Sequence, residues 1–503
     1  MNRDSTPEPF LDWFGIWPGG SGYEADGRGY YHAAPKGVEL VVQPPLGKRD
    51  LNLQRNHPWE DDKPRVETLL QEDGRFRMWY SSSLPDRETV LCYAESEDGF
   101  EWHKPELGLY EFDGSTGNNI VGAGLGGAIF LDTNPNVPDS ERYKLIFKNG
   151  AWNRSGASIA GAEDETDALV LREKLAADGY SEQEIRATIG LEGRVMGAVS
   201  PDGLRWKALE TPLLEMFCDC DNIAFYDQAA DRYVGYFRHN MFRETIPTEW
   251  PPNPWRCIGR AETDDFRRWP TPHVVLQPDV DEPTLDLYTN AYAPYPGDRY
   301  HLMFPSVYYR GTDARDVQLA VSRNGHTWTR YKSTLLARGS EGSNEEGMMS
   351  VRHGIFSFDD NRWGLLYVGM DARHNESYYY DDHRVYSNGF AFWKRERFVG
   401  LEAEVDGQVT LLPRVCGGGR LLLNFKTETG GWVRAAFMEP MLWPPARSGM
   451  ISGFSFDDCE PLRGDQLEGE VRFHGSTNLS ELKGRNICLC LELFRATVFA
   501  TTM

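Results

Sequence analysis

Short runs of this chain alternate aromatic or apolar residues with polar ones, which is the period of a half-buried β-strand. Five of these runs resemble one another, because each begins at or directly after an arginine and continues with aromatic and apolar positions. They are FRMWY at 76–80, RYKLIF at 142–147, RYVGYF at 232–237, RYHLMF at 299–304 and RWGLLYV at 362–368. The pattern predicts five equivalent strands.

A second apolar run precedes each of the five aromatic runs. These runs are PRVETLL at 64–70, GAIFLD at 127–132, DNIAFYD at 221–227, LDLYTNAYAPY at 285–295 and GMMSVRHGIFSF at 347–358. They are short enough to be strands and are bounded by turn-forming residues. We interpret them as the inner strands of five structural repeats.

A seven-residue phrase follows four of the aromatic runs, with a hydroxyl residue first, Asp or Asn near the middle and Trp last. It reads SEDGFEW at 96–102, SPDGLRW at 200–206, TDDFRRW at 263–269 and SRNGHTW at 322–328, and GFAFWKRERFVGL at 389–401 is a degenerate fifth copy. An Asp-Gly or Asn-Gly pair favours a tight turn because it tolerates positive φ. We expect the hydroxyl to bind the turn and the Trp to pack between repeats.

Five repeats of about four strands predict an all-β protein built on a five-bladed β-propeller over residues 30–398, with an N-terminal extension over 1–29. From residue 399 to 503 the chain keeps alternating strands but loses the repeat, which predicts a C-terminal β-sandwich. Residues 161–190 predict one helical insertion, because Ser181 and Glu184 form a capping box.

Composition narrows the class of protein. Aromatic residues make up 13% of the 503 residues, and 50 Gly and 30 Pro are spread along the chain, as in a turn-rich β protein. The eight Cys show no C-x-x-C spacing, so we expect buried thiols in a reducing cytoplasm.

Net charge limits the partners. At −23 the chain repels nucleic acids and anionic lipid surfaces, whereas binding of a neutral ligand is unaffected. No apolar run reaches the roughly 20 residues that cross a bilayer, and the first residues lack the apolar core of a signal peptide. We therefore expect a cytoplasmic protein that binds neither nucleic acid nor membrane.

The chain resembles the β-fructosidase-like glycoside hydrolases, family 32 above all and family 43 more distantly. The closing segment, GFSFDDCEPLRGDQLEGEVRFHGSTNLSELKGRNICLCLELFRATVF, looks like that family's last segment, and the repeated SxDGxxW strands look like its blade strands. The resemblance implies a propeller followed by a sandwich, and cleavage of a glycosidic bond. Departures from the family's catalytic motifs point to a substrate other than sucrose, inulin or levan.

The same resemblance implies catalytic carboxylates at the starts of inner strands. Asp221, in CDCDN, looks like the family's transition-state-stabilising aspartate, and Asp62, in PWEDDKPRV, fits the nucleophile or base position. In the fourth blade Asp286 is the nearest carboxylate, and the fifth blade offers Glu346. Hydrolysis needs two carboxyl groups, one to donate a proton and one to attack or to activate water.

Further polar and aromatic residues near the predicted axis are candidates for holding a sugar, through stacking or hydrogen bonds. They are Trp79, Arg238, His239, Tyr288, Asn290, Glu345, Arg352, His353 and His374. His353 and His374 could hold a central ion, but no metal-ligand spacing supports one, so we expect neither metal nor cofactor.

Two other functions remain open at this stage. One is a non-catalytic carbohydrate-binding propeller, and the other is a protein-interaction propeller. Only an enzyme needs two carboxyl groups about 5–5.5 Å apart for retention or about 6.5–9.5 Å apart for inversion. The sugar itself and the oligomeric state, which edge pairing of the C-terminal domain could make dimeric, are not readable from the sequence.

Overall fold

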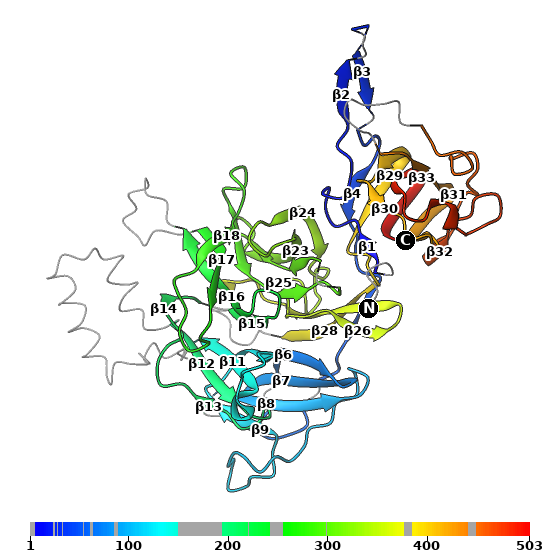
Figure 1. Cartoon of the computed structure of the whole chain (residues 1–503). Coiled ribbons are helices and arrows are strands. Elements are labelled where there is room, and N and C mark those ends of the chain that lie inside the picture. Colours follow the sequence, from blue (N-terminus) through cyan, green and yellow to red (C-terminus); the bar gives the residue numbers. More distant parts are fainter. Residues whose placement is uncertain are drawn as a thin grey trace, which may run out of the picture. The chain divides into compact units, whose positions relative to one another are not determined.

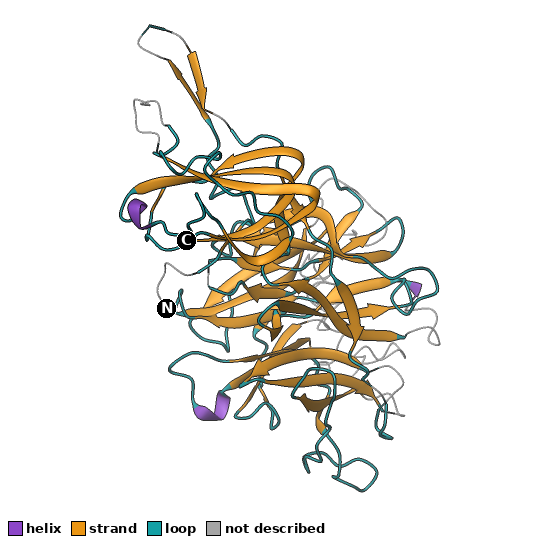
Figure 2. Cartoon of the chain, turned by 90° about the vertical axis from the view of Figure 1, so that its right-hand side faces the viewer, coloured by secondary structure: helices purple, strands orange, loops and turns teal. Residues whose placement is uncertain are grey.

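The computed structural model describes residues 6–23, 26–27, 29–32, 34–53, 55–60, 64–84, 89–148, 194–219, 221–241, 255–297, 299–376, 385–440 and 449–503. The described chain is almost entirely strands and loops, with short helical turns such as η2 (Asp139–Glu141) and η4 (Ser480–Leu482) (Figure 2). It forms two compact units. The larger unit comprises residues 47–356 and 364–391, and the terminal unit comprises 1–46, 357–363 and 392–503.

The larger unit is built from five consecutive sets of antiparallel strands, and Figure 1 labels strands of each set. Set 1 holds β6 (Arg65–Glu72), β7 (Arg75–Ser83), β8 (Thr89–Ser96) and β9 (Ile120–Ala123). Set 2 holds β10 (Gly127–Leu131), β11 (Tyr143–Lys148), β12 (Arg194–Ser200), β13 (Lys207–Ala208) and β14 (Leu214–Phe217). Set 3 holds β15 (Ile223–Asp227), β16 (Arg232–Met241), β17 (Trp255–Thr263) and β18 (His273–Leu276).

The last two sets are joined into one eleven-stranded sheet. Set 4 holds β19 (Leu285–Thr289), β20 (Tyr292–Pro294), β21 (His301–Met303), β22 (Ser306–Tyr309), β23 (Ala314–Ser322) and β24 (Thr329–Leu336). Set 5 holds β25 (Met348–Val351), β26 (Phe356–Asp359), β27 (Arg362–Met370), β28 (Tyr386–Lys394) and β5 (Gly47–Asp50). A single parallel bridge, Arg315 to Met348, connects the two sets. The five aromatic runs form β7, β11, β16, β21 and β27, which are second in sets 1 to 3 and third in sets 4 and 5.

Hydrogen bonds connect each set to the next and the fifth set back to the first. The donor and acceptor pairs are Ile129 N to Thr68 Oγ1 at 3.0 Å, Tyr233 Oη to Asp132 Oδ2 at 2.7 Å, Tyr236 Oη to Gly325 O at 3.0 Å, Ser306 Oγ to Met349 O at 3.1 Å, and Arg352 Nε to Val66 O at 2.8 Å. The succession of contacts is therefore cyclic.

The repeated phrase forms the predicted turn. In the first copy Ser96 Oγ accepts the N–H of Gly99 at 2.9 Å, and Asp98 Oδ1 accepts two further N–H groups at 2.8 Å. The copies that begin at Ser200 and Ser322 repeat these bonds with nearly the same distances. The turn glycines have φ between 71° and 82°, which an L side chain adopts only with strain. The motif is thus a structural device in this chain.

The turn also links neighbouring sets, through the glycine more than through the tryptophan. The carbonyl of Gly203 accepts the indole N–H of Trp79 from set 1 at 2.7 Å, and Trp79 is fully buried. Among the four motif tryptophans only Trp269 is buried, at 5% exposure, whereas the other three are half-buried. The sequence therefore overstated how deeply the motif tryptophan is inserted, since Trp79 of the aromatic strand occupies the core.

We expect Gly203→Ala to destabilise the protein by about 2–4 kcal/mol, because a Cβ would combine positive-φ strain with overpacking. That atom would lie 2.8 Å from Trp79 Cζ2. The matched control is Gly342→Ala, which has φ of 80° but no atom within 4 Å of the added carbon, so it should cost about 1 kcal/mol. Urea unfolding of both variants tests this, and equal losses would contradict a packing role for the turn.

The main strands of the terminal unit belong to one hydrogen-bonded sheet. It contains β4 (Glu39–Val42), β29 (Val399–Thr410), β31 (Leu422–Met438), β32 (Asp465–Glu470) and β33 (Asn486–Thr502), with β1 (Glu8–Pro9) and β30 (Arg414–Val415) beside β33. A separate hairpin, β2 (Gly20–Tyr23) and β3 (Gly29–His32), belongs to the same unit. Register shifts interrupt the three longest strands, and a bulge lets one strand bend around a core.

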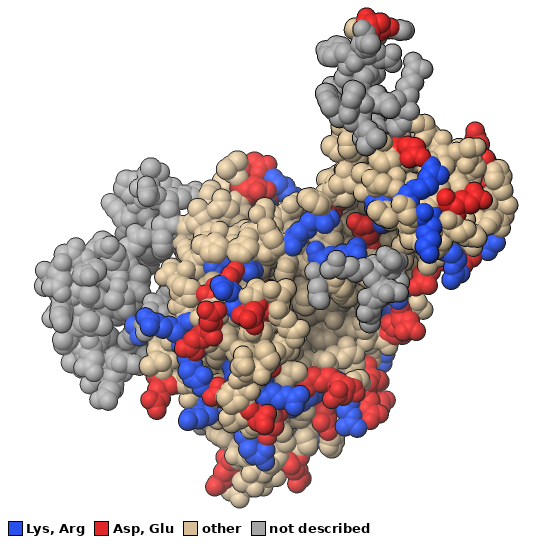
Figure 3. All heavy atoms as spheres, viewed as in Figure 1, with Lys and Arg blue, Asp and Glu red and all other residues tan. Residues whose placement is uncertain are grey.

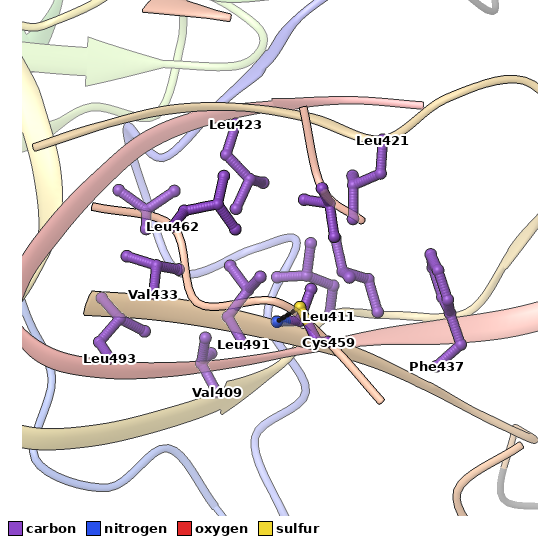
Figure 4. Close-up of a cluster of buried hydrophobic side chains, with 14 of the residues drawn as sticks. Val409, Leu411, Leu421, Leu423, Val433, Phe437, Cys459, Leu462, Leu491 and Leu493 are labelled. Atoms are coloured by element: carbon purple, nitrogen blue, oxygen red, sulfur yellow. Dashed lines mark hydrogen bonds between the residues drawn. The ribbon is translucent and has the colours of Figure 1, made fainter. Parts of the chain in front are cut away.

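One hydrophobic core holds this unit together (Figure 4). Leu423 and Val433, from the two ends of β31, and Leu491 of β33 belong to the same buried cluster. The chain boundaries differ from the predicted ones at 29/30 and 398/399. Residues 1–46 cluster with the C-terminal strands because β4 pairs with β29 and β1 pairs with β33.

Three further expectations have outcomes here. The helical insertion at 161–190 lies outside the described residues. The seven cysteines within the described ranges are buried, as predicted, and none of them forms a disulfide. Within the described ranges, no helix has the length and hydropathy needed to cross a bilayer. Acidic and basic side chains are interspersed on the described face seen in Figure 3, without one extended patch of either sign.

Candidate functional site

Asp221 stands two residues before β15, in a conformation that non-glycine residues seldom adopt. Its φ is 54°, in the left-handed region. The carboxylate Oδ1 lies 3.1 Å from Nη1 of Arg352, and 23% of the side chain is exposed. Unusual backbone conformations of this kind are concentrated at functional sites. Asp221 is therefore a charged, accessible and firmly held carboxylate.

Arg352 connects Asp221 to the first set of strands. It follows β25, is only 5% exposed and donates its Nε–H to the carbonyl of Val66 in β6. One guanidinium thus bridges the start of set 1 and the start of set 3. Sequence reasoning predicted both Arg352 and Asp221 at the site, and the structure brings these two together.

Glu67, the residue after Val66, was missed by the sequence analysis. It is buried, and its Oε1 accepts hydrogen bonds from Nη2 of Arg65 at 2.6 Å and from Oγ of Ser81 at 2.7 Å. The negative charge of Glu67 raises the pKa of Arg65 above its ordinary value, even though burial acts in the opposite direction. The alternation of β6 had suggested only a structural strand, and nothing in RVETLL distinguishes Glu67 as functional.

Several buried polar atoms beside this group have no hydrogen-bond partner in the described chain. Both ring nitrogens of His353, both amide atoms of Asn290 and the hydroxyl of Thr289 are in this condition. Burial and the charge of Arg352 lower the pKa of His353 to about 4, so the imidazole is neutral at pH 7. Buried polar groups are normally hydrogen-bonded, so such a concentration indicates a place where ligand or solvent atoms complete the bonding.

Asn290, rather than Asp286, is the fourth-set counterpart of Asp221. The aromatic strand β21 pairs with β20, so β20 is the equivalent of β15, and Asn290 stands two residues before it. Asp286 lies in β19, which pairs with β22 instead. The sequence had merged β19 and β20 into one run, and therefore assigned the wrong residue to this position.

Asp286 is a buried ion-pair residue. Its side chain is fully buried, with Oδ2 2.9 Å from Nη1 of Arg256 and Oδ1 2.7 Å from Nη2 of Arg310. Both carboxylate oxygens are bound by guanidinium groups, and the side chain is closed to solvent, so neither oxygen is placed to reach a substrate. The predicted catalytic role of Asp286 therefore has no support in its surroundings.

Arg238 extends the site from Asp221 toward set 4. Its backbone N–H is donated to Asn222 Oδ1 at 3.0 Å, and its guanidinium is hydrogen-bonded to the carbonyl of Tyr288. Nη1 of Arg238 lies 3.6 Å from Asp219, which also binds Lys148 at 3.0 Å. Burial opposes the charge of Asp219, but these two cations outweigh it and hold the pKa of Asp219 below its ordinary value.

Tyr288 is surrounded by three guanidinium groups. Those of Arg238, Arg256 and Arg315 lie 4.4, 4.9 and 4.5 Å from the centre of its ring. The Tyr288 hydroxyl lies 2.7 Å from Nε2 of His374. Burial, Arg315 and Arg256 lower the pKa of His374 to about 4. Asp221, Arg238, Tyr288 and His374 thus belong to one connected polar group, which we call the central cluster together with Arg315, Arg352, His353, Asn290 and Glu67.

The remaining predicted residues lie elsewhere or carry less information. Trp79 is in the hydrophobic core, and Asp62 lies outside the described residues. Glu345 pairs with Lys48, and Glu346 accepts a turn N–H from Gly342, so neither has a contact to the central cluster. His239 is adjacent to Arg238 in β16, and its Nδ1 is another buried atom with no partner in the described chain.

A surface cavity of about 480 Å³ in the larger unit is a separate feature. It is lined by residues 211–214, 267–269 and Thr271. None of these residues carries a carboxyl or imidazole group. The cavity therefore lacks the groups needed for acid–base chemistry, and the central cluster is the better candidate.

Several solved structures of carbohydrate-active proteins are similar to this chain at low sequence identity. No family model and no curated protein sequence matches it. Among solved structures it is similar to a "Glycoside hydrolase", with 11% identity, TM-score 0.43 and coverage of 66% of this chain and 88% of the other.

Two further structures are of the same kind. An N-acetylgalactosamine deacetylase from F. plautii in complex with blood group B trisaccharide has 13% identity, TM-score 0.40 and coverage of 71% and 96%. The catalytic domain of the Coprinopsis cinerea GH62 alpha-L-arabinofuranosidase has 11% identity, TM-score 0.38 and coverage of 72% and 98%. Likeness at this level carries no argument about activity, so the function must be argued from the site.

Proposed function

We propose that this chain is a glycoside hydrolase whose reaction takes place at the central cluster, with Asp221 as its principal carboxylate. The observation that carries the proposal is the setting of Asp221. Its carboxylate is partly exposed, is held by the buried Arg352 and belongs to a residue with positive φ. Beside it, His353 and Asn290 present polar atoms with no partner in the described chain. A sugar supplies many hydroxyls that could pair with such atoms.

The proposed reaction divides the work between two carboxyl groups. Asp221, which is paired with Arg352, accepts a proton from water as the water oxygen attacks the anomeric carbon. The bond from that carbon to the glycosidic oxygen breaks, and the leaving oxygen takes a proton from a second carboxyl group. Glu67 and the predicted Asp62 are the candidates for this second group. The amide of Asn290 can form hydrogen bonds with a sugar, but it has no carboxyl proton to donate.

We further propose that the larger unit is a five-bladed propeller, as the sequence predicted. The cyclic succession of hydrogen bonds among the five strand sets supports it. In such a fold the inner strands converge, which would gather residues from sets 1, 3, 4 and 5 in one pocket. The similarity to family 32, the C-terminal sandwich and the cytoplasmic location remain predictions, as does a small carbohydrate as the partner.

A non-catalytic carbohydrate-binding protein is the second candidate, and one specific observation favours it. Asp221, Glu67, Asp219 and Asp286 are each paired with at least one arginine. Each of these carboxylates is therefore bound to a cation, whereas hydrolysis needs one carboxyl group that can give a proton to the leaving oxygen. If Asp62 is not that group, the cluster would bind a sugar without cleaving it.

Hydrolysis of fructosides, arabinosides, galactosides and glucosides by the whole chain tests the proposal. We expect Asp221→Asn to lower the rate on the best substrate several hundredfold, a loss typical of removing an acid–base group. Asparagine tolerates positive φ, so this change should remove the charge and keep the fold. Glu67→Gln and Asp62→Asn, assayed alongside, identify the second carboxyl group.

The matched control is Asp360→Asn, which changes an exposed aspartate outside the cluster. It should retain the wild-type rate. Full activity in Asp221→Asn would refute the proposed role. Binding of a sugar that requires Asp221, with no cleavage of any substrate, would establish the second candidate instead.

A further inference from the structure

Arg315 is the cation of the central cluster that has no anionic partner in the described chain. Its guanidinium lies over the ring of Tyr288, but it forms no hydrogen bond or ion pair with any described residue, and its Nε is buried. The two other arginines around the same ring differ in this respect. Arg238 is paired with Asp219, and Arg256 is paired with Asp286.

The surroundings of Arg315 carry an excess of positive charge. Three guanidinium groups lie near the ring of Tyr288, those of Arg238, Arg256 and Arg315. A fourth, that of Arg310, shares the carboxylate of Asp286 with Arg256. Asp219 and Asp286 are the carboxylates bound to them, and Asp286 takes two of the four. Asp313 lies two residues before Arg315, but its oxygens accept hydrogen bonds from Tyr308 and from Asn375. Asp316 directly follows Arg315 in the sequence, and it is paired with Arg338.

The excess of positive charge also acts on His374. Its ring packs against Tyr288 and Tyr308, and it has Arg315 and Arg256 on one side and Asp313, 4.0 Å away, on the other. Burial lowers the pKa of His374, and the two arginines lower it further, to about 4. This cation-rich region lies inside a chain of net charge −23, so it is a local feature and does not follow from overall composition.

Arg315 is half-buried, and its Nε is a buried donor with no partner in the described chain, which is costly unless a ligand or water completes the bonding. The planar fork of arginine suits carboxylate, sulfate and phosphate groups, which can accept two of its hydrogen bonds at once. Arg315 is also linked to Asp221 through Tyr288, Arg238 and Asn222. These contacts connect Arg315 to the residue that follows Asp221.

We propose that Arg315 binds an oxyanion on the sugar ligand, so that the site selects sugars bearing a carboxylate, sulfate ester or phosphate ester. In this proposal Arg315 determines which class of sugar binds, and Asp221 takes part in the reaction. This inference rests on the proposed carbohydrate site, but not on cleavage.

Binding measurements on the whole chain test the inference. Titration calorimetry with glucuronate, glucose 6-sulfate and glucose 6-phosphate, each beside glucose, and with galacturonate beside galactose, compares the three oxyanions with neutral counterparts. We expect at least tenfold tighter binding of one charged member, weakened by added sodium chloride. Arg315→Gln should abolish that preference, so that the charged sugar and its neutral counterpart bind with equal affinity.

The matched control is Arg205→Gln, which removes the same charge from a side chain that is 66% exposed in a turn of set 2. It should keep the full preference. Equal binding of charged and neutral sugars by the wild-type chain would overturn the inference, and so would an undiminished preference in Arg315→Gln.

A second measurement separates this inference from the proposed function. Millimolar phosphate or sulfate, compared with chloride at equal ionic strength, should raise the Tm of the wild type and of Arg205→Gln, but not of Arg315→Gln. This response without hydrolysis would mean that the anion site stands and the hydrolase proposal fails. Hydrolysis of neutral sugars, with the same anion response in all three proteins, would mean the reverse.

If Arg315→Gln does not fold, the wild type alone still decides. Phosphate bound at Arg315 should raise the pKa of His374 from about 4, because a nearby anion favours the imidazolium form. The His374 resonance, assigned by comparison with His374→Gln, reports this in an NMR pH titration. An unchanged pKa at saturating phosphate would overturn the inference.

Discussion

Replacing Asp286 by asparagine should lower the free energy of unfolding by about 3 kcal/mol, because the change leaves two guanidinium groups without their carboxylate. Asp286 is fully buried, and it binds Arg256 and Arg310 at 2.9 and 2.7 Å and accepts the backbone N–H of Arg256 at 3.0 Å. The two arginines are 24% and 21% exposed, so solvent limits the loss to the lower end of the range for buried pairs. Urea unfolding of the purified variant measures it.

Two controls make this result informative about the site. Asp281→Asn alters a neighbouring aspartate that is 69% exposed and paired with Lys332, so we expect no measurable change in stability. Asp221→Asn should also remain stable, since asparagine keeps the turn. A stable Asp286→Asn that has lost hydrolysis would contradict this picture and return Asp286 to the catalytic group.

The strands and turns could be predicted because their causes are local. In the SxDGxxW turn, Ser96, Asp98 and Gly99 bind one another within seven residues, so the sequence contains every partner. The aromatic strands were equally readable from their alternation. The pairing of β4 with β29 was not, since it joins residues more than 350 positions apart and neither strand has a distinctive pattern.

The sequence predicted only those site residues that flank an inner strand. Asp221 and Arg352 were found because they flank inner strands, and they do meet. Asp286 was chosen because a single apolar run in the sequence is two strands in the structure. The sequence could not distinguish Arg315 from the other arginines, because only the fold shows which arginines are paired with a carboxylate. Arg238 and Arg256 are paired in this way, and Arg315 is not paired with any described carboxylate.

Stability should fall as the pH drops from about 6.5 to about 4, by about 3 kcal/mol for each of two histidines. The pKa of His353 and that of His374 are both lowered to about 4, the first by burial and Arg352, the second by burial, Arg315 and Arg256. Between that value and the ordinary 6.5 the unfolded chain binds a proton that the folded chain does not. The unfolded state is therefore favoured increasingly as the pH falls through this window, and below pH 4 the loss levels off.

Urea unfolding between pH 4.5 and 7.5 measures this slope in the wild type, in His353→Gln and in His374→Gln. Each variant should lose about half of the dependence, whereas His103→Gln, at an exposed position, should keep the wild-type slope. Asp221 and Glu67 act on His353, and Asp313 acts on His374, in the direction that raises the imidazole pKa, but burial and the arginines outweigh them. Saturating phosphate should flatten the part due to His374, because an anion on Arg315 stabilises its imidazolium in the folded state. A slope that persists in both variants would mean that neither histidine is held neutral by the arginines and burial of the central cluster.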